Sequence, residues 1–474
     1  MNSIVWLRRD LRLADNPALQ AALDEGGAVL PLYIHAPQEE APWQPGAASR
    51  AWLHRSLAAL ADALAERGSR LLLRSGDSAA VLLQLLRDTG AGTVYCNRLY
   101  EPAARARDER VFALLESAGA RVQAFDGNLL LPPGRPRTIA GGAYRVFGAW
   151  WRAAAPLLGE PRPLAAPARL PPVPAALAGE ALDGFDLRPA PRWDRKFWES
   201  GWQPGEAGAQ EMLEAFVEGA AHGYAQQREL PGRIGSSRLS PHLHFGELSP
   251  RQALAATRAA TSPRVPAADQ ARFATELGWR EFAVQTLVAN PEYGERDLDP
   301  GFRHFRWATP DPARLRAWQL GETGVPLVDA GMRELWQTGW MHNRVRMVVA
   351  SFLTKNLRYH WSHGARWFWD TLVDADLANN SQGWQWTAGT GADAAPYFRV
   401  FNPARQGERF DPRGEYVRRW VPELARLPDK ALHAPWEHAA LARRLAPDYP
   451  VAPIVDLASS RQAALEAFRR RKEA

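Results

Sequence analysis

The sequence Ile4-Val5-Trp6-Leu7 is the first of five short apolar runs, and the spacing of these runs decides the fold of the first part of the chain. The other runs are Ala28 to Ile34, Arg70 to Leu73, Thr93 to Tyr95 and Arg121 to Phe125. Stretches with a helical pattern separate them. Alternation of strand and helix is typical of a parallel sheet with right-handed crossovers and helices on both faces. We therefore predict that residues 1–130 form an α/β unit with a doubly wound, Rossmann-like parallel sheet.

The pattern changes after this unit. Seven prolines lie between residues 156 and 174, too densely for a helix or a central strand, so residues 131–204 are predicted to be a Pro-rich linker. Later segments follow a helical period, among them Gly208 to Ala221, Asp269 to Ala289, Val325 to Thr338 and Asn343 to Leu357. Residues 205–474 are therefore predicted to form a larger, all-helical unit.

Composition limits the environment and the partners. The net charge of +6 allows a polyanionic partner, although only four of the 58 basic residues are lysines and the arginine excess can reflect genome composition instead. Cys96 is the only cysteine, which excludes an internal disulfide and favours a reducing cytoplasm. Charged residues from Arg8 to Asp10 interrupt any signal peptide, and no apolar stretch approaches a membrane span of about 18–20 residues.

Common catalytic and nucleotide-binding motifs are absent from the sequence. It contains no G-x-G-x-x-G, no P-loop and no G-x-S-x-G, so neither a standard dinucleotide loop nor a serine hydrolase is indicated. His242 and His244 form an H-x-H pair without further ligands at a zinc-like spacing. We expect these histidines in a core or a helix cap, and no metal.

Tryptophans are unusually dense in one region. Ten of the twenty lie between Trp279 and Trp386. Most of them can fill an aromatic core, while some could stack on extruded bases or carry electrons. Composition leaves these interpretations open.

Several motifs resemble the DNA photolyase and cryptochrome family, in family order. They are Val5 to Asn16 (VWLRRDLRLADN), Ser237 to Ser240 (SRLS), Trp279 to Phe282 (WREF), Gly339 to Met347 (GWMHNRVRM), and Asp374 to Leu377 (DADL) leading into Gly383 to Trp386 (GWQW). The sequence is most similar to cyclobutane pyrimidine dimer photolyases. The resemblance implies an antenna-binding α/β unit and a helical unit that binds FAD and DNA.

The resemblance also implies roles for individual residues. Its FAD-binding residues are Tyr224, Ser236, Ser237, Arg238, Leu239, Ser240, Arg346, Asp374, Ala375, Asp376 and Asn380. The serine segment is implied to bind the diphosphate, Arg346 to pair with Asp374, and Asn380 to face flavin N5. Its DNA-binding residues are Arg228, Glu276, Trp279, Asn343, Arg344, Met347, Trp386 and Gln406. Its electron-relay tryptophans are Trp384, Trp361 and Trp307, with Trp318 as an alternative to Trp307 or a branch. Glu276 is also implied to hydrogen-bond the dimer during repair.

The implied activity is light-dependent repair of cyclobutane pyrimidine dimers in UV-damaged DNA, by electron transfer from photoexcited reduced FAD to a dimer flipped out of the duplex. The alternatives are a cryptochrome photoreceptor without repair and a (6-4) photolyase. Glu101 aligns with a glutamate that contacts methenyltetrahydrofolate, so this antenna is expected, with a deazaflavin or an empty site as alternatives. A monomer is expected.

Overall fold

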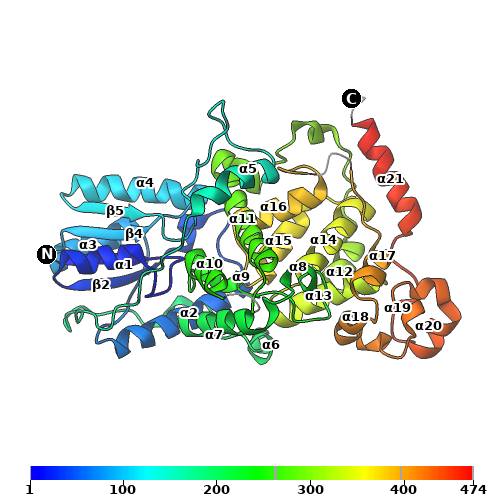
Figure 1. Ribbon diagram of the computed structural model, residues 1–474, viewed down its shortest axis with the longest axis horizontal. Coiled ribbons are helices and arrows are strands. Elements are labelled where there is room, and N and C mark those ends of the chain that lie inside the picture. The colour runs from blue at the N-terminus through cyan, green and yellow to red at the C-terminus, as the bar shows by residue number, and fades with distance from the viewer. Residues whose placement is uncertain (1, 261–263, 395–397, 472–474) are drawn as a thin grey trace.

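A five-stranded parallel sheet forms the core of the first unit (Figure 1). The computed structural model describes residues 2–260, 264–394 and 398–471. The strands are β1 (Ser3–Leu7), β2 (Val29–His35), β3 (Leu72–Ser75), β4 (Thr93–Asn97) and β5 (Arg121–Phe125). Their order is β3-β2-β1-β4-β5, and Val5 of β1 lies between Pro31 of β2 and Tyr95 of β4. The predicted α/β class is confirmed.

Alternate residues of the central strand point to opposite faces of the sheet. The helices are α1 (Pro17–Glu25), α2 (Ala47–Glu66), α3 (Ser78–Thr89) and α4 (Pro102–Ser117). Val5 and Leu7 belong to a buried cluster with residues of α1 and α2, whereas Ile4 and Trp6 belong to one with residues of α3 and α4. The sheet is therefore covered on both faces, as the doubly wound pattern predicts.

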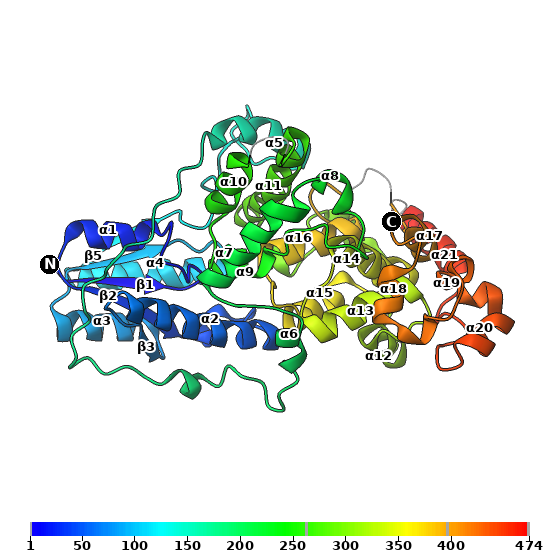
Figure 2. The same ribbon diagram turned by 60° about the horizontal axis from the view of Figure 1, so that its bottom comes forward.

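The segment between the two units is mostly extended but contains two α-helices, α5 (Phe147–Ala154) and α6 (Arg195–Glu199), and two short 3-10 helices. It runs along the outside of the α/β unit, where the Leu170 amide donates to the Arg67 carbonyl over 2.9 Å and the Glu180 amide to the Leu73 carbonyl over 3.0 Å (Figure 2). Helix α5 packs instead on α11 of the second unit. Helix α5 of the segment therefore packs as part of the helical unit.

The second unit is helical throughout its described residues. Its helices are α7 (Glu206–Ala215), α8 (Tyr224–Gln227), α9 (Ser240–Phe245), α10 (Pro250–Ala259), α11 (Ala267–Ala289), α12 (Pro312–Leu320), α13 (Pro326–Thr338), α14 (Asn343–Ser351), α15 (Trp361–Thr371), α16 (Leu377–Ala388), α17 (Pro403–Phe410), α18 (Glu415–Trp420), α19 (Asp429–Leu432), α20 (Ala439–Leu445) and α21 (Leu457–Arg470). Single π-helical turns extend α7 and α14, which accounts for the longer helices predicted there. The predicted all-helical class is confirmed.

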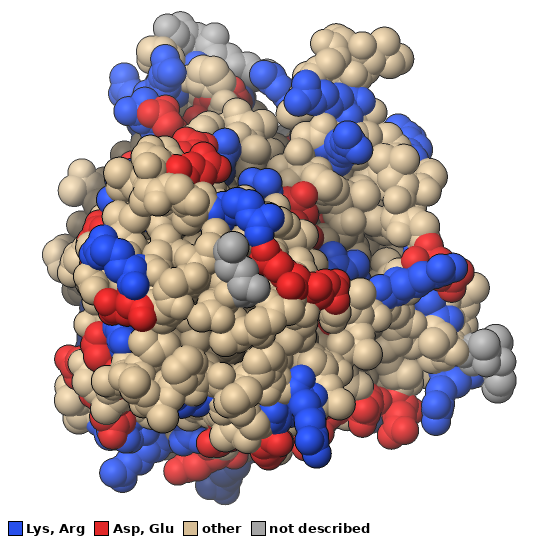
Figure 3. Space-filling model, turned by 90° about the vertical axis from the view of Figure 1, so that its left-hand side faces the viewer, with Lys and Arg blue, Asp and Glu red and all other residues tan. Residues whose placement is uncertain are grey.

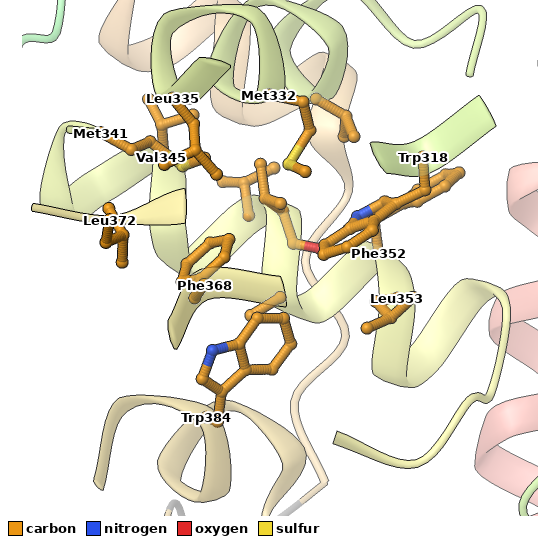
Figure 4. Packing of buried hydrophobic residues seen from close by; sticks show 14 of the residues in the cluster. Trp318, Met332, Leu335, Met341, Val345, Phe352, Leu353, Phe368, Leu372 and Trp384 are labelled. Atoms are coloured by element: carbon orange, nitrogen blue, oxygen red, sulfur yellow. The ribbon is translucent and has the colours of Figure 1, made fainter. Parts of the chain in front are cut away.

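An aromatic and aliphatic core fills the space between α13, α14, α15 and α16 (Figure 4). Trp318 and Trp384 lie within it, at 0% and 2% exposure, and Phe368 contacts both indoles. A Cβ at Gly364 of α15 would overlap the Trp384 indole, so only glycine permits this approach of α15 and α16. Five of the ten tryptophans between Trp279 and Trp386 are buried core residues, as one of the two interpretations of their number expects.

A buried polar network joins the two units. His242 Nδ1 lies 2.5 Å from Glu247, whose other oxygen accepts from the Trp52 indole over 3.0 Å and from the Gly205 amide over 2.8 Å. Gly246 ends α9 with a φ of 65°, and a side chain there would overlap the Arg9 carbonyl. His242 is therefore a core residue, as expected for the H-x-H pair.

Charge is spread over the outer end of the α/β unit. Figure 3 shows acidic and basic side chains intermingled on this face, separated by broad uncharged areas. No helix in the described part of the chain has the length and apolarity needed to cross a membrane.

Candidate flavin and DNA site

The loop between α8 and α9 holds Arg238 in an unusual environment. Its backbone has a φ of 52°, in the left-handed region that residues other than glycine rarely adopt. Its guanidinium lies 4.2 Å from the ring centroid of Trp202 and 5.3 Å from that of Trp340. Burial lowers the pKa of Arg238, and only Glu334 opposes this effect. A half-buried cation whose buried Nε has no partner is suited to bind an anion such as a diphosphate.

The neighbouring residues of this predicted diphosphate segment are half-buried to exposed, except Leu239, which is buried. The Leu239 amide lies 3.5 Å from the Ser237 hydroxyl, and the Ser240 hydroxyl accepts from the Trp340 indole over 3.1 Å. Among the described residues, the Ser236 side chain makes no hydrogen bond. Tyr224 is buried on α8 between Phe216 and Phe273. Sequence reasoning did not identify Trp202, which lies outside the family motifs.

The turn before α16 brings together the predicted pair of Arg346 and Asp374. The guanidinium donates to Asp374 Oδ2 over 2.8 Å and to the Met341 carbonyl over 2.7 Å. Asp374 Oδ1 is buried without a partner. Ala375 is buried in the same turn. An acceptor oxygen is therefore left available for an N–H group of a ligand.

Asp376 caps α16 and lies next to His244. Its carboxylate accepts from the Asn379 amide over 2.8 Å, and its Oδ2 is 3.9 Å from His244 Nδ1, which is buried without a hydrogen-bond partner. Burial alone would raise the pKa of Asp376, but the His244 imidazole and the Asn379 amide hold it well below its usual range. Asn380, one turn into α16, donates from its side-chain amide to the Ala365 carbonyl over 2.9 Å.

An ion-pair network links α8, α11 and α14 at the edge of this region. Glu276 Oε2 lies 2.7 Å from Arg228 and its Oε1 2.9 Å from Arg272. Glu229 pairs with both Arg228 and Arg344. Burial raises the pKa of Glu276, although both arginines oppose the rise. Three predicted DNA-binding residues, Arg228, Glu276 and Arg344, are thus in one network, which Glu229 and Arg272 complete.

The remaining predicted lesion contacts line neighbouring helices. Trp279 of α11 stacks on Phe147 of α5, with centroids 3.7 Å apart and planes within 11°. Trp386 of α16 is half-buried, Asn343 of α14 is exposed and Met347 is half-buried. Helix α16 packs against both α11 and α14, and the described residues show no ring contact between Trp279 and Trp386. Gln406 of α17 is half-buried and its Oε1 has no partner.

The predicted relay tryptophans form two separate contacts. Trp384 packs edge-on against Trp318, with centroids 6.2 Å apart (Figure 4). Trp361 donates from its indole to Asp297 over 2.7 Å, and the His360 ring lies 5.2 Å from both Trp361 and Trp307. No direct ring contact joins Trp384 to Trp361 within the described residues. Trp318, the expected alternative to Trp307, therefore contacts Trp384. Trp307 is connected to Trp361 by the ring of His360, which contacts both.

Glu334 of α13 is a buried acid near Arg238 that the sequence analysis did not identify. Glu334 accepts from the Tyr416 hydroxyl over 2.6 Å and from the His342 amide over 3.1 Å. Burial raises the pKa of Glu334 to about 7 and lowers the pKa of His342 to about 4. A carboxylate within the apolar stripe of the predicted helix Val325 to Thr338 was the sequence signal for it.

These residues fit a flavin dinucleotide. The unpartnered buried atoms of Arg238, Asp374 and His244 supply donors for phosphate and acceptors for ring or ribose hydrogens. Among the residues that the structure describes, no group of three His, Cys, Asp or Glu side chains is arranged to hold a metal ion. The fold therefore combines an α/β unit with a helical unit whose buried, unpartnered polar atoms suit such a dinucleotide.

Comparison with known proteins gives the family. A family model described as DNA photolyase matches residues 3–171, and one described as the FAD binding domain of DNA photolyase matches residues 273–470. A deoxyribodipyrimidine photo-lyase of Agrobacterium fabrum is 45% identical over 98% of this chain and 97% of the relative. Cryptochrome-1 of Arabidopsis thaliana is 38% identical over 96% of this chain and 68% of the relative.

A solved structure of a bacterial class III photolyase from Agrobacterium tumefaciens superposes with a TM-score of 0.94 and 45% identity, over 100% of this chain and 98% of that one. The chain belongs to the DNA photolyase family, which includes cryptochromes among its relatives. The predicted family, fold and photolyase enzyme class are confirmed, and FAD is the cofactor that the matched domain supports.

Proposed function

We propose that this protein repairs cyclobutane pyrimidine dimers in UV-damaged DNA under light. The observation that carries the proposal is the edge formed by Glu276 and Trp279, three residues apart on one face of α11 and next to the arginines of the ion-pair network. A flipped-out pyrimidine dimer needs a flat surface for stacking and a polar group for hydrogen bonds to the edges of its bases. Trp279 offers the surface and Glu276 the polar group. Relatives named deoxyribodipyrimidine photo-lyase support the substrate.

The half-buried indoles of Trp279 and Trp386 would stack on the flipped-out lesion. Unstacking a base costs a few kcal/mol, least at a damaged site, and stacking on an aromatic side chain returns about 1–3 kcal/mol per base. Trp279 is held flat by Phe147 and therefore loses little freedom when a base stacks on it. Arg228, Arg344 and Gln406 would contact the phosphates next to the lesion, with Asn343, Met347 and Trp386 on the remaining side.

The buried residues serve the cofactor. FAD, when bound in its reduced form, supplies an electron for ring opening after absorbing light. Arg346 would remain paired with Asp374 and place a positive charge at the edge of the isoalloxazine, while Asn380 presents an amide to its N5 side. Arg238 would bind the diphosphate. The indole of Trp384, held by Phe368 and Trp318, would pass electrons to the flavin.

The antenna is proposed to be methenyltetrahydrofolate in a cavity of about 280 Å³ between the two units. Glu101 lines this cavity and pairs with Arg9, and Trp43 and Trp369 form an edge-on pair in its wall with centroids 5.2 Å apart. Leu377, the first residue of α16, also lines it. Titration with the folate and with a deazaflavin, read by absorbance in wild-type protein and in Glu101→Gln, would separate these ligands from an empty site.

The decisive experiment is a repair assay on the chemically reduced holoprotein. A thymine-dimer oligonucleotide is incubated in light and in darkness, with a (6-4) substrate in parallel, and the products are separated by chromatography. We expect light-dependent restoration of the dimer substrate alone. Equal results in light and darkness would indicate a photoreceptor without repair, as in the cryptochrome relatives, and turnover of only the (6-4) substrate would assign the protein to that class. The monomeric state and cytoplasmic location stay predictions.

A further inference from the structure

A basic arm projects from the surface next to the proposed lesion site. It comprises residues 132–146, between β5 and α5, and rises above α5 at the top of the molecule (Figure 1). Its tip is a closed turn, because the Thr138 amide donates to the Gly142 carbonyl over 2.9 Å and the Gly141 amide to the Thr138 carbonyl over 2.8 Å. Ile139 within this turn is fully exposed. A well-defined turn therefore presents an aliphatic side chain to solvent.

One end of the arm is fixed to helix α11, which carries Trp279, and the other end to the turn that follows α16. At one end, Gln285 of α11 accepts from the Gly134 amide over 2.6 Å and donates to the Pro132 and Arg135 carbonyls. At the other end, the Asp393 amide donates to the Arg145 carbonyl over 3.0 Å, and its carboxylate accepts from the Phe147 amide over 3.3 Å. Phe147 is the residue that stacks on Trp279. The base of the arm is thus part of the wall behind the proposed stacking surface.

The charge of the arm is uncompensated. Arg135, Arg137 and Arg145 are exposed, and none of them pairs with a carboxylate in the part of the chain that the structure describes. The sequence from residue 127 to residue 159 contains neither aspartate nor glutamate. Exposed aliphatic residues flanked by arginines are unfavourable in water and complementary to nucleic acid, whose phosphates attract the cations while the base stack accepts an apolar wedge.

We propose that the 132–146 arm is a duplex-DNA-binding element that supports the opened helix around the flipped-out dimer. The arginines bind backbone phosphates, and Ile139 inserts into the base stack that the dimer has left. This inference rests on the proposed repair function and extends it from the lesion to the surrounding duplex. It assigns the arm a role that a single-stranded substrate would not need.

The arginine part is tested by replacing Arg135, Arg137 and Arg145 together by alanine in the holoprotein. Arg87, Arg162 and Arg169, exposed on other parts of the molecule, are replaced together as a control with the same loss of charge. Affinity for a thymine-dimer duplex is measured against salt concentration. Each lost phosphate contact should reduce the slope of log K against log salt by about 0.9 in the arm variant only. Equal slopes in the two triple variants would overturn the proposal.

The wedge is tested by Ile139→Ala, with Leu114→Ala on α4 as the control for an exposed aliphatic side chain. We expect duplex affinity to fall about tenfold, or about 1.4 kcal/mol, with affinity for the single-stranded lesion unchanged. A 2-aminopurine opposite the dimer should report less unstacking in Ile139→Ala than in wild type. Wild-type values for both duplex measurements would exclude insertion of Ile139.

The single-stranded lesion separates this inference from the proposed function. If the arm variants repair a single-stranded dimer in light as well as the wild type and bind the duplex equally well, the arm proposal fails and the repair function stands. If wild-type protein repairs neither substrate, the repair function itself fails. Flavin absorbance of each variant shows that the cofactor site is intact.

Discussion

The interior and the edge of the helical unit use the same kinds of residue under different constraints. In the interior, Trp384 and Glu334 are buried and held by several neighbours. At the edge, Trp279 and Glu276 are only partly covered: Trp279 contacts Phe147 and Phe282, and Glu276 pairs with two arginines. The comparison indicates that the packing around a residue, more than its type, distinguishes the residues proposed to serve the cofactor from those proposed to bind the lesion.

The sharpest test of the comparison uses two tryptophans of the helical unit, one interior and one exposed. Trp384→Phe should abolish light-driven reduction of oxidised FAD, because the interior indole is the proposed first donor to the flavin. Repair by chemically reduced protein should persist. Trp336→Phe, which changes an exposed indole stacked between Trp193 and Trp367, is the control and should photoreduce normally. Flavin absorbance under blue light measures both, and normal photoreduction in Trp384→Phe would remove the residue from the relay.

The interior acid should make stability depend on pH. Because burial raises the pKa of Glu334 from an ordinary value of 4.5 to about 7, folding takes up a proton between these two pH values. The free energy of unfolding should therefore fall as pH rises from about 4.5 to 7, by about 3 kcal/mol in total. Glu334→Gln keeps an acceptor for Tyr416 and should flatten this fall in denaturant titrations. An unchanged pH profile in the variant would assign the effect to another group.

Two glycines test how tightly the interior is packed. Gly364→Ala would place a methyl group against the Trp384 indole and should destabilise the protein by about 1–3 kcal/mol. Gly383 lies on the exposed side of α16, where an added Cβ would have no neighbouring atom within 4 Å, so Gly383→Ala should stabilise the helix by up to about 1 kcal/mol. Thermal unfolding distinguishes the two, and equal shifts would mean that α15 can move away from α16.

A moderate effect on binding is expected from a change at the edge of the helical unit. Trp279→Ala should weaken binding of a dimer oligonucleotide by about 1–2 kcal/mol, or roughly 5- to 30-fold, since one stacking surface is lost. Flavin content should remain that of the wild type because Trp279 is outside the cofactor contacts. Loss of flavin in this variant would show that the residue belongs to the interior instead.

The sequence predicted the fold well because both units have strong local signals. The apolar runs at Ile4 to Leu7 and Arg121 to Phe125 coincide with strands β1 and β5 to within one residue. Contacts between distant segments were harder to predict. Phe147 lies in a stretch assigned to the linker, yet it stacks on Trp279, which is 132 positions later in the chain and reached only through the packing of α5 on α11.

The candidate site shows the same limit. Family motifs predicted that Arg346 and Asp374 pair, and the pair is present at 2.8 Å. Motifs could not predict that Trp202 covers Arg238, because this contact brings together two loop residues that are 36 positions apart in the chain. The sequence also could not predict which tryptophan lies next to Trp384. The contacts of Trp384 with Trp318 and Phe368 depend on how the helices pack.

Helix α16 has one further consequence. It begins at Leu377 in the wall of the cavity between the units, carries Asn380 and Trp386, and ends at Ala388, whose carbonyl accepts from the buried amino group of Lys355. Its twelve residues span about 18 Å. A pigment in that cavity and a flavin beside Asn380 would be aligned by one continuous rod, so the angle between their transition dipoles would be insensitive to small movements of the two units.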